Sequence, residues 1–186
     1  MITVVPDRFT QVFFDADRIA SLTTAALARV PELDLASAVE VRVDQNAATS
    51  QATVTSVDPI VFAVDSGALE DYRDPRYLGD EAAAVTLTRL FLEVADRRRD
   101  DFGGPDLDAE VSLAHAQAWD VVLHGRTEAL GLELYRPRYR YNFRNRHGFT
   151  DAADAVFDRL WTAGPVPWDQ IVAWSDEATA VAPSGL

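Results

Sequence analysis

The sequence lacks cysteine and lysine entirely, and it holds a single methionine and three histidines. Without cysteine there is no disulfide framework, no thiolate zinc site and no cysteine nucleophile. Without lysine the GxxxxGK[ST] phosphate loop and the SxxK motif are excluded, and neither GxGxxG nor GxSxG occurs. The familiar signatures of nucleotide binding and of serine or cysteine catalysis are therefore absent.

Positive charge is also scarce. The chain has 30 acidic residues against 17 arginines, which gives a net charge of −13. A chain this acidic repels phosphate backbones at long range, so general nucleic-acid binding is disfavoured. No apolar run approaches the roughly 18 residues of a membrane helix, and the first residues do not have the pattern of a signal peptide. We therefore expect a cytoplasmic protein that does not interact with membranes.

The composition of the 186 residues, 48% apolar and 25% charged, is typical of one globular domain. Strand patterns cluster in the first third, and apolar residues with a helical period fill the rest. This order predicts a single α+β domain over residues 1–186, in which four to five helices pack on a small, mostly antiparallel sheet of about three strands. The expected strands are 39–43, 52–57 and 60–64, and the expected helices are 15–30, 80–99, 109–130 and two that begin near 150 and 167. Residues 181–186 are expected to form a flexible tail.

Two of these elements carry a further expectation. The continuous apolar run at 60–64 is typical of a central strand that is covered on both faces. Gly125 lies on the apolar face of the helix 109–130, where the absence of a side chain permits the close approach of another helix.

The three histidines do not have the spacing of metal ligands. His115 and His124 are nine residues apart, which places them on opposite faces of a helix, and no HExxH motif occurs. We therefore expect no metal site and no cofactor.

Asp120, His124 and Glu128 follow one another at intervals of four and share a helix face. A carboxylate beside an imidazole stabilises the charged ring and can prepare it for proton transfer. The same spacing also describes a solvated polar stripe opposite the apolar face of the helix. Both interpretations stay open.

The loop after the third expected strand is rich in carboxylates, which are ligands for hard cations. These acids are Asp65, Glu70, Asp71, Asp74, Asp80 and Glu81. Their spacing matches no EF-hand, and Arg73 and Arg76 lie among them. Local ion pairing is therefore the favoured interpretation.

The segment 135–147 departs from the acidic character of the chain, because it holds five arginines and no acid. If the segment is extended, its side chains alternate between two sides. One side then carries Arg136, Arg138, Arg140 and Arg144, and the other carries Tyr135, Tyr139, Tyr141 and Phe143. Guanidinium groups arranged in this way can bind carboxylate or phosphate through paired hydrogen bonds.

Three uses of this segment remain open. Asn145, Arg146 and His147 precede a helix that Thr150 caps, and together with the first N–H groups of that helix they form a candidate anion site. Alternatively, the arginines form a clamp or a subunit interface by pairing with acids elsewhere, namely Asp96, Asp100, Asp101, Asp106, Asp108 and Glu110. The interleaving of arginine with aromatic residues also suits single-stranded nucleic acid, although the net charge opposes it.

The order helix, three strands, helix over residues 15–100 resembles the layout of the minimal zincin-like metalloproteases. The strand Ile60-Val61-Phe62, the acidic loop after it and the helix 81–99 resemble the stretch that ends in the HExxH helix of that family. The helix of this chain reads Val85-Thr86-Leu87-Thr88-Arg89-Leu90-Phe91-Leu92-Glu93, and no ligand residue matches. The resemblance therefore implies a metal-free, non-catalytic relative, and no catalytic residue is carried over.

These observations favour a non-catalytic binding or protein-interaction domain that acts through the segment 135–147, on a partner protein or a second copy of the chain. One alternative is a divergent enzyme for a small anionic substrate, in which Arg138, Arg140 and Arg146 hold the anion and His147 or His124 transfers protons. A third hypothesis is the binding of single-stranded nucleic acid.

Overall fold

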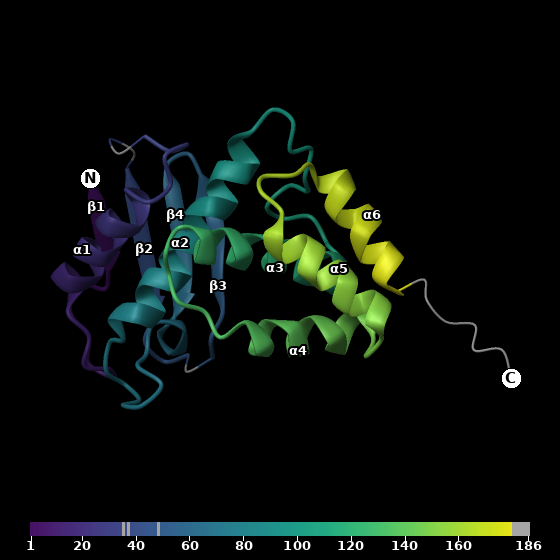
Figure 1. Cartoon of the computed structure of the whole chain (residues 1–186). Coiled ribbons are helices and arrows are strands. Elements are labelled where there is room, and N and C mark those ends of the chain that lie inside the picture. Colours follow the sequence, from purple (N-terminus) through teal and green to yellow (C-terminus); the bar gives the residue numbers. More distant parts are fainter. Residues whose placement is uncertain (35, 37, 48, 180–186) are drawn as a thin grey trace, which may run out of the picture. The chain divides into compact units, whose positions relative to one another are not determined.

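The computed structural model describes residues 1–34, 36, 38–47 and 49–179. The chain divides into two compact units, Met1–Arg98 and Arg99–Leu186. Within the described residues, the first unit holds a β-sheet and two α-helices, and the second holds four α-helices (Figure 1). The single domain expected over residues 1–186 stays a prediction, and the tail expected at 181–186 lies outside the described residues.

The first unit is built on a four-stranded sheet. Its strands are β1 (Ile2–Val5), β2 (Val39–Asp44), β3 (Ala52–Val57) and β4 (Ile60–Asp65), in the spatial order β1-β2-β4-β3. The pairs β1–β2 and β2–β4 are parallel, and the pair β3–β4 is antiparallel. The α+β class is thus confirmed, whereas the sheet has four strands rather than about three and is mostly parallel rather than mostly antiparallel.

Both differences have a physical reason. The unexpected strand β1 has only four residues before Pro6, too few to show a periodic pattern. It connects to β2 through the helix α1 (Ala16–Leu27), and a helical crossover returns the chain in the same direction. β2 and β4 run in the same direction and pair directly, because β3 lies outside β4 instead of between these two strands. The alternation of side chains that locates a strand contains no information about its direction.

One face of the sheet is covered by α1 and α2 (Asp80–Arg98), which pack on each other. The valines of β2 that point toward these helices, Val39, Val41 and Val43, are buried, as the alternation predicts. On the other face Arg42, Asp44 and Thr53 are exposed, so the helices of this unit leave this part of the sheet uncovered. The central position of β4 is confirmed, but Ala63 and Asp65 are only half-buried, so the strand is not covered on both faces as expected.

The second unit holds the helices α3 (Leu113–Ala129), α4 (Arg136–His147), α5 (Asp151–Thr162) and α6 (Trp168–Thr179). The described residues thus form six α-helices, and the one that the sequence did not predict is α4. The start of α5 is as expected, because the side chain of Thr150 accepts a hydrogen bond from the backbone N–H of Ala153 at 3.1 Å. No helix in the described ranges is long and apolar enough to span a bilayer.

Candidate functional site: the arginine helix α4

The arginine-rich segment forms a helix and not the extended ladder described above. Pro137 lies in the first turn of α4, where its missing N–H group costs nothing and its fixed φ suits a helix. Gly148 ends the helix with a φ of 102°, a conformation that few other residues adopt. Helical geometry changes which arginines share a side, because neighbours are now separated by three or four residues instead of two.

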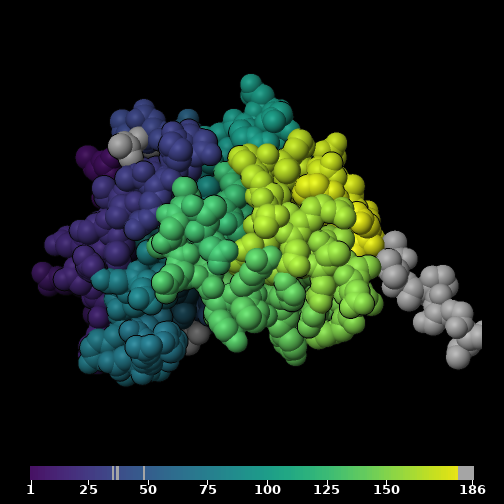
Figure 2. Space-filling view, in the orientation of Figure 1, coloured from purple at the N-terminus to yellow at the C-terminus, as the bar shows by residue number. Residues whose placement is uncertain are grey.

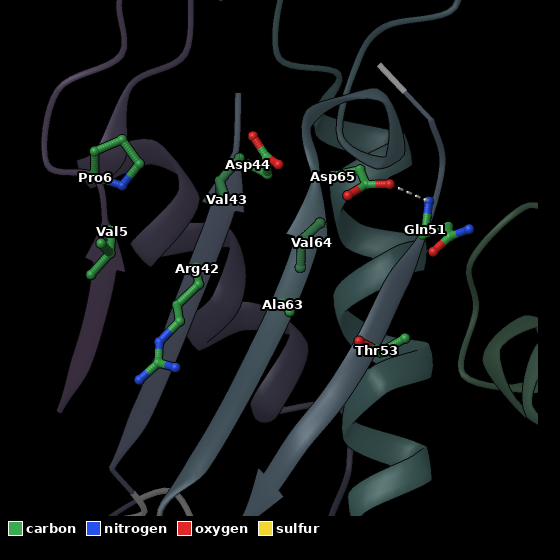
Figure 3. Close-up of a pocket in the computed structure, with 10 residues that line it drawn as sticks. All are labelled: Val5, Pro6, Arg42, Val43, Asp44, Gln51, Thr53, Ala63, Val64 and Asp65. Atoms are coloured by element: carbon green, nitrogen blue, oxygen red, sulfur yellow. Dashed lines mark hydrogen bonds between the residues drawn. The ribbon is translucent and has the colours of Figure 1, made fainter. Parts of the chain in front are cut away.

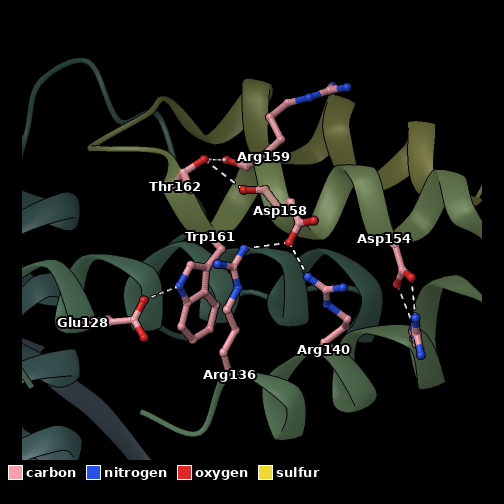
Figure 4. Close-up of polar contacts among 9 residues, drawn as sticks. Glu128, Arg136, Arg140, Asp154, Asp158, Arg159, Trp161 and Thr162 are labelled. Carbon is pink, nitrogen blue, oxygen red and sulfur yellow. Dashed lines mark hydrogen bonds and ion pairs between the residues drawn. The ribbon is translucent and has the colours of Figure 1, made fainter. Parts of the chain in front are cut away.

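Arg136, Arg140 and Arg144 lie at intervals of four on one face of α4, toward α5. Nη2 of Arg136 lies 2.6 Å from Oδ1 of Asp158, and Arg140 bonds to the same oxygen. Arg144 pairs with Asp154 through two hydrogen bonds, one of them 2.7 Å from Nε to Oδ1. Because the two aspartates are also four residues apart, the rows of opposite charge match along the two helices (Figure 4).

Aromatic rings of α5 reinforce this pairing. The guanidinium carbon of Arg136 lies 5.4 Å from the ring centroid of Trp161, and that of Arg140 lies 5.0 Å from the centroid of Phe157. The hydrogen bonds from Arg144 lower the pKa of Asp154. The three arginines therefore join α4 to α5 as a clamp, and their partners are two aspartates of α5 rather than the acids between residues 96 and 110.

The opposite side of α4 faces solvent, and we call it the outer face of α4. Its polar residues are Arg138, Asn142, Asn145 and Arg146, all exposed. Neither Arg138 nor Arg146 has an ion-pair partner among the described residues. Three exposed rings flank the outer face, those of Tyr135 (74%), Tyr141 (57%) and Phe149 (62%). The space-filling view shows this part of the chain, in light green, at the surface (Figure 2).

His147 does not join Asn145 and Arg146 in an anion site. It lies on the buried side of α4, where its Nδ1 is 3.1 Å from the carbonyl oxygen of Phe143 and its Nε2 is 2.8 Å from Oγ of Ser175. The ring stacks on that of Phe143 with a centroid distance of 3.8 Å. Burial lowers the pKa of His147, so the neutral ring is favoured, and the Ser175 hydroxyl donates to Nε2.

Asp120, His124 and Glu128 share one face of α3 as predicted, but this face is not a solvated stripe. His124 is 8% exposed, and its Nδ1 donates to the backbone oxygen of Asp120 at 2.8 Å. Its ring centroid lies 4.2 Å from that of Tyr139 in α4. Oε2 of Glu128 accepts a hydrogen bond from Nε1 of Trp161 at 2.7 Å (Figure 4). His124 and Glu128 thus help to pack α3 against α4 and α5, and Asp120 holds the His124 ring in place.

The carboxylates of the loop after β4 are dispersed instead of convergent. Asp80 pairs with Arg18 of α1, which lowers the pKa of Asp80, and Asp71 accepts from the backbone N–H of Arg73 at 2.8 Å. Asp65 accepts from the side chain of Thr49. The described residues contain no group of three or more histidine or acidic side chains that could hold a metal ion.

Sequence reasoning missed a pocket of about 490 Å³ on the uncovered face of the sheet. It lies at the carboxyl ends of β1, β2 and β4, and residues that line it include Val5, Arg42, Asp44, Ala63 and Asp65 (Figure 3). The sequence feature that indicates this pocket is the small side chain of Ala63, which lies between larger residues of neighbouring strands. Those neighbours are identified only when the register of the sheet is known.

Comparisons with protein-family models, with curated proteins and with solved structures gave no match. The order helix, three strands, helix is present as α1-β2-β3-β4-α2. Because this order alone does not define a family, the zincin-like resemblance stays a prediction.

Proposed function

We propose that this protein is a non-catalytic binding protein whose outer face of α4 recognises an acidic segment of a partner protein. The observation that carries the proposal is the division of the arginines of α4. Three of them are used within the fold, whereas Arg138 and Arg146 project from the exposed side with no ion-pair partner among the described residues.

The composition of the outer face suits a protein partner. Guanidinium groups bind carboxylates through paired hydrogen bonds, and the amides of Asn142 and Asn145 add donors and acceptors beside them. Tyrosine and arginine are enriched among residues that dominate the energy of protein interfaces. A convex helix face lacks the concave shape that encloses a small molecule, so it favours a macromolecular partner.

The clamp gives this face a defined shape before any partner binds. Arg136 and Arg140 hold α4 on Asp158, and Phe143 is completely buried beneath the helix. A surface that is already ordered loses less conformational entropy when it binds. The net charge of −13 does not prevent recognition of an acidic segment, because physiological salt screens exposed charges beyond about 8 Å.

The alternative of an enzyme for a small anion receives less support from this geometry. Arg138 and Arg146 lie on the exposed side of α4, and Arg140 pairs with Asp158 of α5. His147 lies on the buried side of α4 and is engaged by Ser175. His124 is engaged by Asp120 and covered by Tyr139. The proposed anion-holding arginines and the proposed proton-transfer groups therefore do not face one another.

A charge-reversal experiment tests the proposal. The variant Arg138→Glu with Arg146→Glu removes the cations of the outer face, and Arg8→Glu with Arg73→Glu is the matched control. The control arginines are also exposed, and neither forms an ion pair within the described residues. The probe is a fluorescent decaglutamate peptide, and its anisotropy is measured at physiological salt.

We expect the peptide to bind the wild type and the control, and to bind the α4 variant roughly tenfold more weakly or worse. Circular dichroism establishes that each variant is folded. Equal binding by all three proteins would contradict the proposal. Tighter binding of oligothymidylate than of decaglutamate would favour the nucleic-acid hypothesis instead.

A further inference from the structure

A second candidate site, independent of α4, lies on the uncovered face of the sheet of the first unit. The register places Val5, Arg42, Ala63 and Thr53 in one row across the four strands. Ala63 is the smallest side chain of this row and stands near its middle, on β4. The row therefore has a hollow above Ala63, and this hollow forms the floor of the pocket (Figure 3).

The next row on the same face brings two carboxylates together. Asp44 of β2 and Asp65 of β4 are paired across neighbouring parallel strands, whose backbones are about 4.8 Å apart. Asp44 uses Oδ1 to accept from the N–H of Asn46 at 2.9 Å, and Asp65 uses Oδ2 to accept from Thr49 and from the N–H of Gln51. The second oxygen of each carboxylate has no hydrogen-bond partner among the described residues.

Two like charges in directly opposed positions repel each other unless a cation lies between them. Arg42 does not supply that cation, because its Nε pairs with Glu40 of the same strand. Its side chain points away from Asp44 in the close-up (Figure 3). The pocket thus combines a small apolar floor with an uncompensated negative end.

The position of the pocket is also one that binding sites favour. In sheets with parallel strands, ligands tend to bind at the carboxyl ends of the strands. The pocket is lined there by residues from the ends of β1, β2 and β4. Its volume of about 490 Å³ is within the range of small-molecule sites.

We propose that this pocket binds a small organic cation, a primary amine with a short apolar body. The ammonium group lies between Asp44 and Asp65, and the apolar body lies over Ala63 and against Val5. A calcium ion fits less well, because it takes six to eight oxygen ligands and the described residues contain no cluster of three or more candidate ligands.

The test uses n-butylamine as the probe and follows backbone amide chemical shifts of the whole chain by NMR. Butan-1-ol has the same apolar body without the charge, and calcium chloride supplies a cation without the body. Ala63→Leu fills the hollow without a change of charge. Asp44→Asn with Asp65→Asn removes the negative end, and Asp74→Asn with Asp108→Asn is the control for net charge, since both of these aspartates are exposed.

We expect n-butylamine to cause saturable shifts at Asp44, Ala63 and Asp65 that butan-1-ol does not cause. Ala63→Leu should abolish these shifts, and Asp44→Asn with Asp65→Asn should weaken binding roughly tenfold or more. Asp74→Asn with Asp108→Asn should bind n-butylamine as the wild type does. Shifts that butan-1-ol reproduces, or that calcium alone produces, would overturn the proposal. If Ala63→Leu does not fold, the aspartate variant still decides, because wild-type affinity in it would exclude the site. Decaglutamate binding by α4 is a separate readout, so either proposal can fail alone.

Discussion

Gly125 of α3 lies against the backbone of Trp161 in α5, so closely that a Cβ atom on Gly125 would stand 1.9 Å from the carbonyl oxygen of Trp161. No side chain fits there unless the two helices separate. Gly125→Ala should therefore destabilise the protein by about 1–3 kcal/mol, although alanine is the better helix former.

Chemical denaturation of the variant measures this cost. Gly164→Ala is the matched control, because a Cβ on Gly164 meets no atom within 4 Å and its φ is not positive. We expect the control to unfold at the denaturant concentration of the wild type or slightly above it. An unchanged midpoint for Gly125→Ala would show that the helices do not approach as closely as described.

The division of the arginines in α4 leads to a second prediction. Arg136→Ala with Arg140→Ala removes two ion pairs to Asp158 and three contacts with aromatic rings, and we expect a loss of about 1–2 kcal/mol. These side chains are about one-third exposed, so a larger loss is not expected. Arg138→Ala with Arg146→Ala removes the same charge from the outer face and should leave the free energy of unfolding unchanged.

Urea unfolding at two salt concentrations measures both variants. The difference between the Arg136/Arg140 variant and the wild type should become smaller at high salt, because salt screens partly exposed ion pairs. If the two double variants lose equal stability, Arg136 and Arg140 stabilise the fold no more than the exposed Arg138 and Arg146 do, and the clamp is contradicted.

The sequence predicted a close contact between helices only at a glycine, the residue type that permits one. Gly125 interrupts a face of otherwise apolar residues, and the absence of its side chain indicated a close contact before the partner helix was known. Strand β1 gave no such signal, since four residues do not establish a period. The strand boundaries 52–57 were correct, whereas strand direction depends on connections that alternation does not describe.

The segment 135–147 shows why the candidate site was harder to predict. Its residues alternate between arginine and aromatic side chains, which favours a strand, and they also place Arg136, Arg140 and Arg144 at helical intervals. Asp154 and Asp158 of α5 have the spacing that matches a helical α4. They lie 10, 18 and 22 residues after the arginines that they bind. The pocket over Ala63 depends in the same way on register between strands, which a single sequence does not contain.

The buried His147 gives a prediction about pH. Burial is the main cause that lowers its pKa below the ordinary 6.5, and the nearby His115 lowers it further, whereas the Phe143 carbonyl and Asp176 act in the opposite direction. Below pH 6.5 the unfolded chain therefore takes up a proton that the folded protein resists. The contribution of His147 to stability is complete above that pH and is lost as the pH falls from 6.5 toward the lowered pKa.

Urea unfolding between about pH 5.5 and 8 measures how the free energy of unfolding changes with pH. This window lies around the ordinary pKa of histidine. It also lies above the titration of Asp154 and Glu177, because Arg144 and Arg159 lower the pKa values of these two carboxyls. His147→Gln should flatten the dependence, since glutamine keeps polar atoms in place without titrating. Ser175→Ala should lower stability at every pH but keep the slope, because burial and not the hydroxyl is the main cause of the shift. If His147→Gln shows the same pH dependence of stability as the wild type, another titrating group causes that dependence. If Ser175→Ala shows no pH dependence, the hydrogen bond to Nε2, rather than burial, keeps the His147 ring neutral.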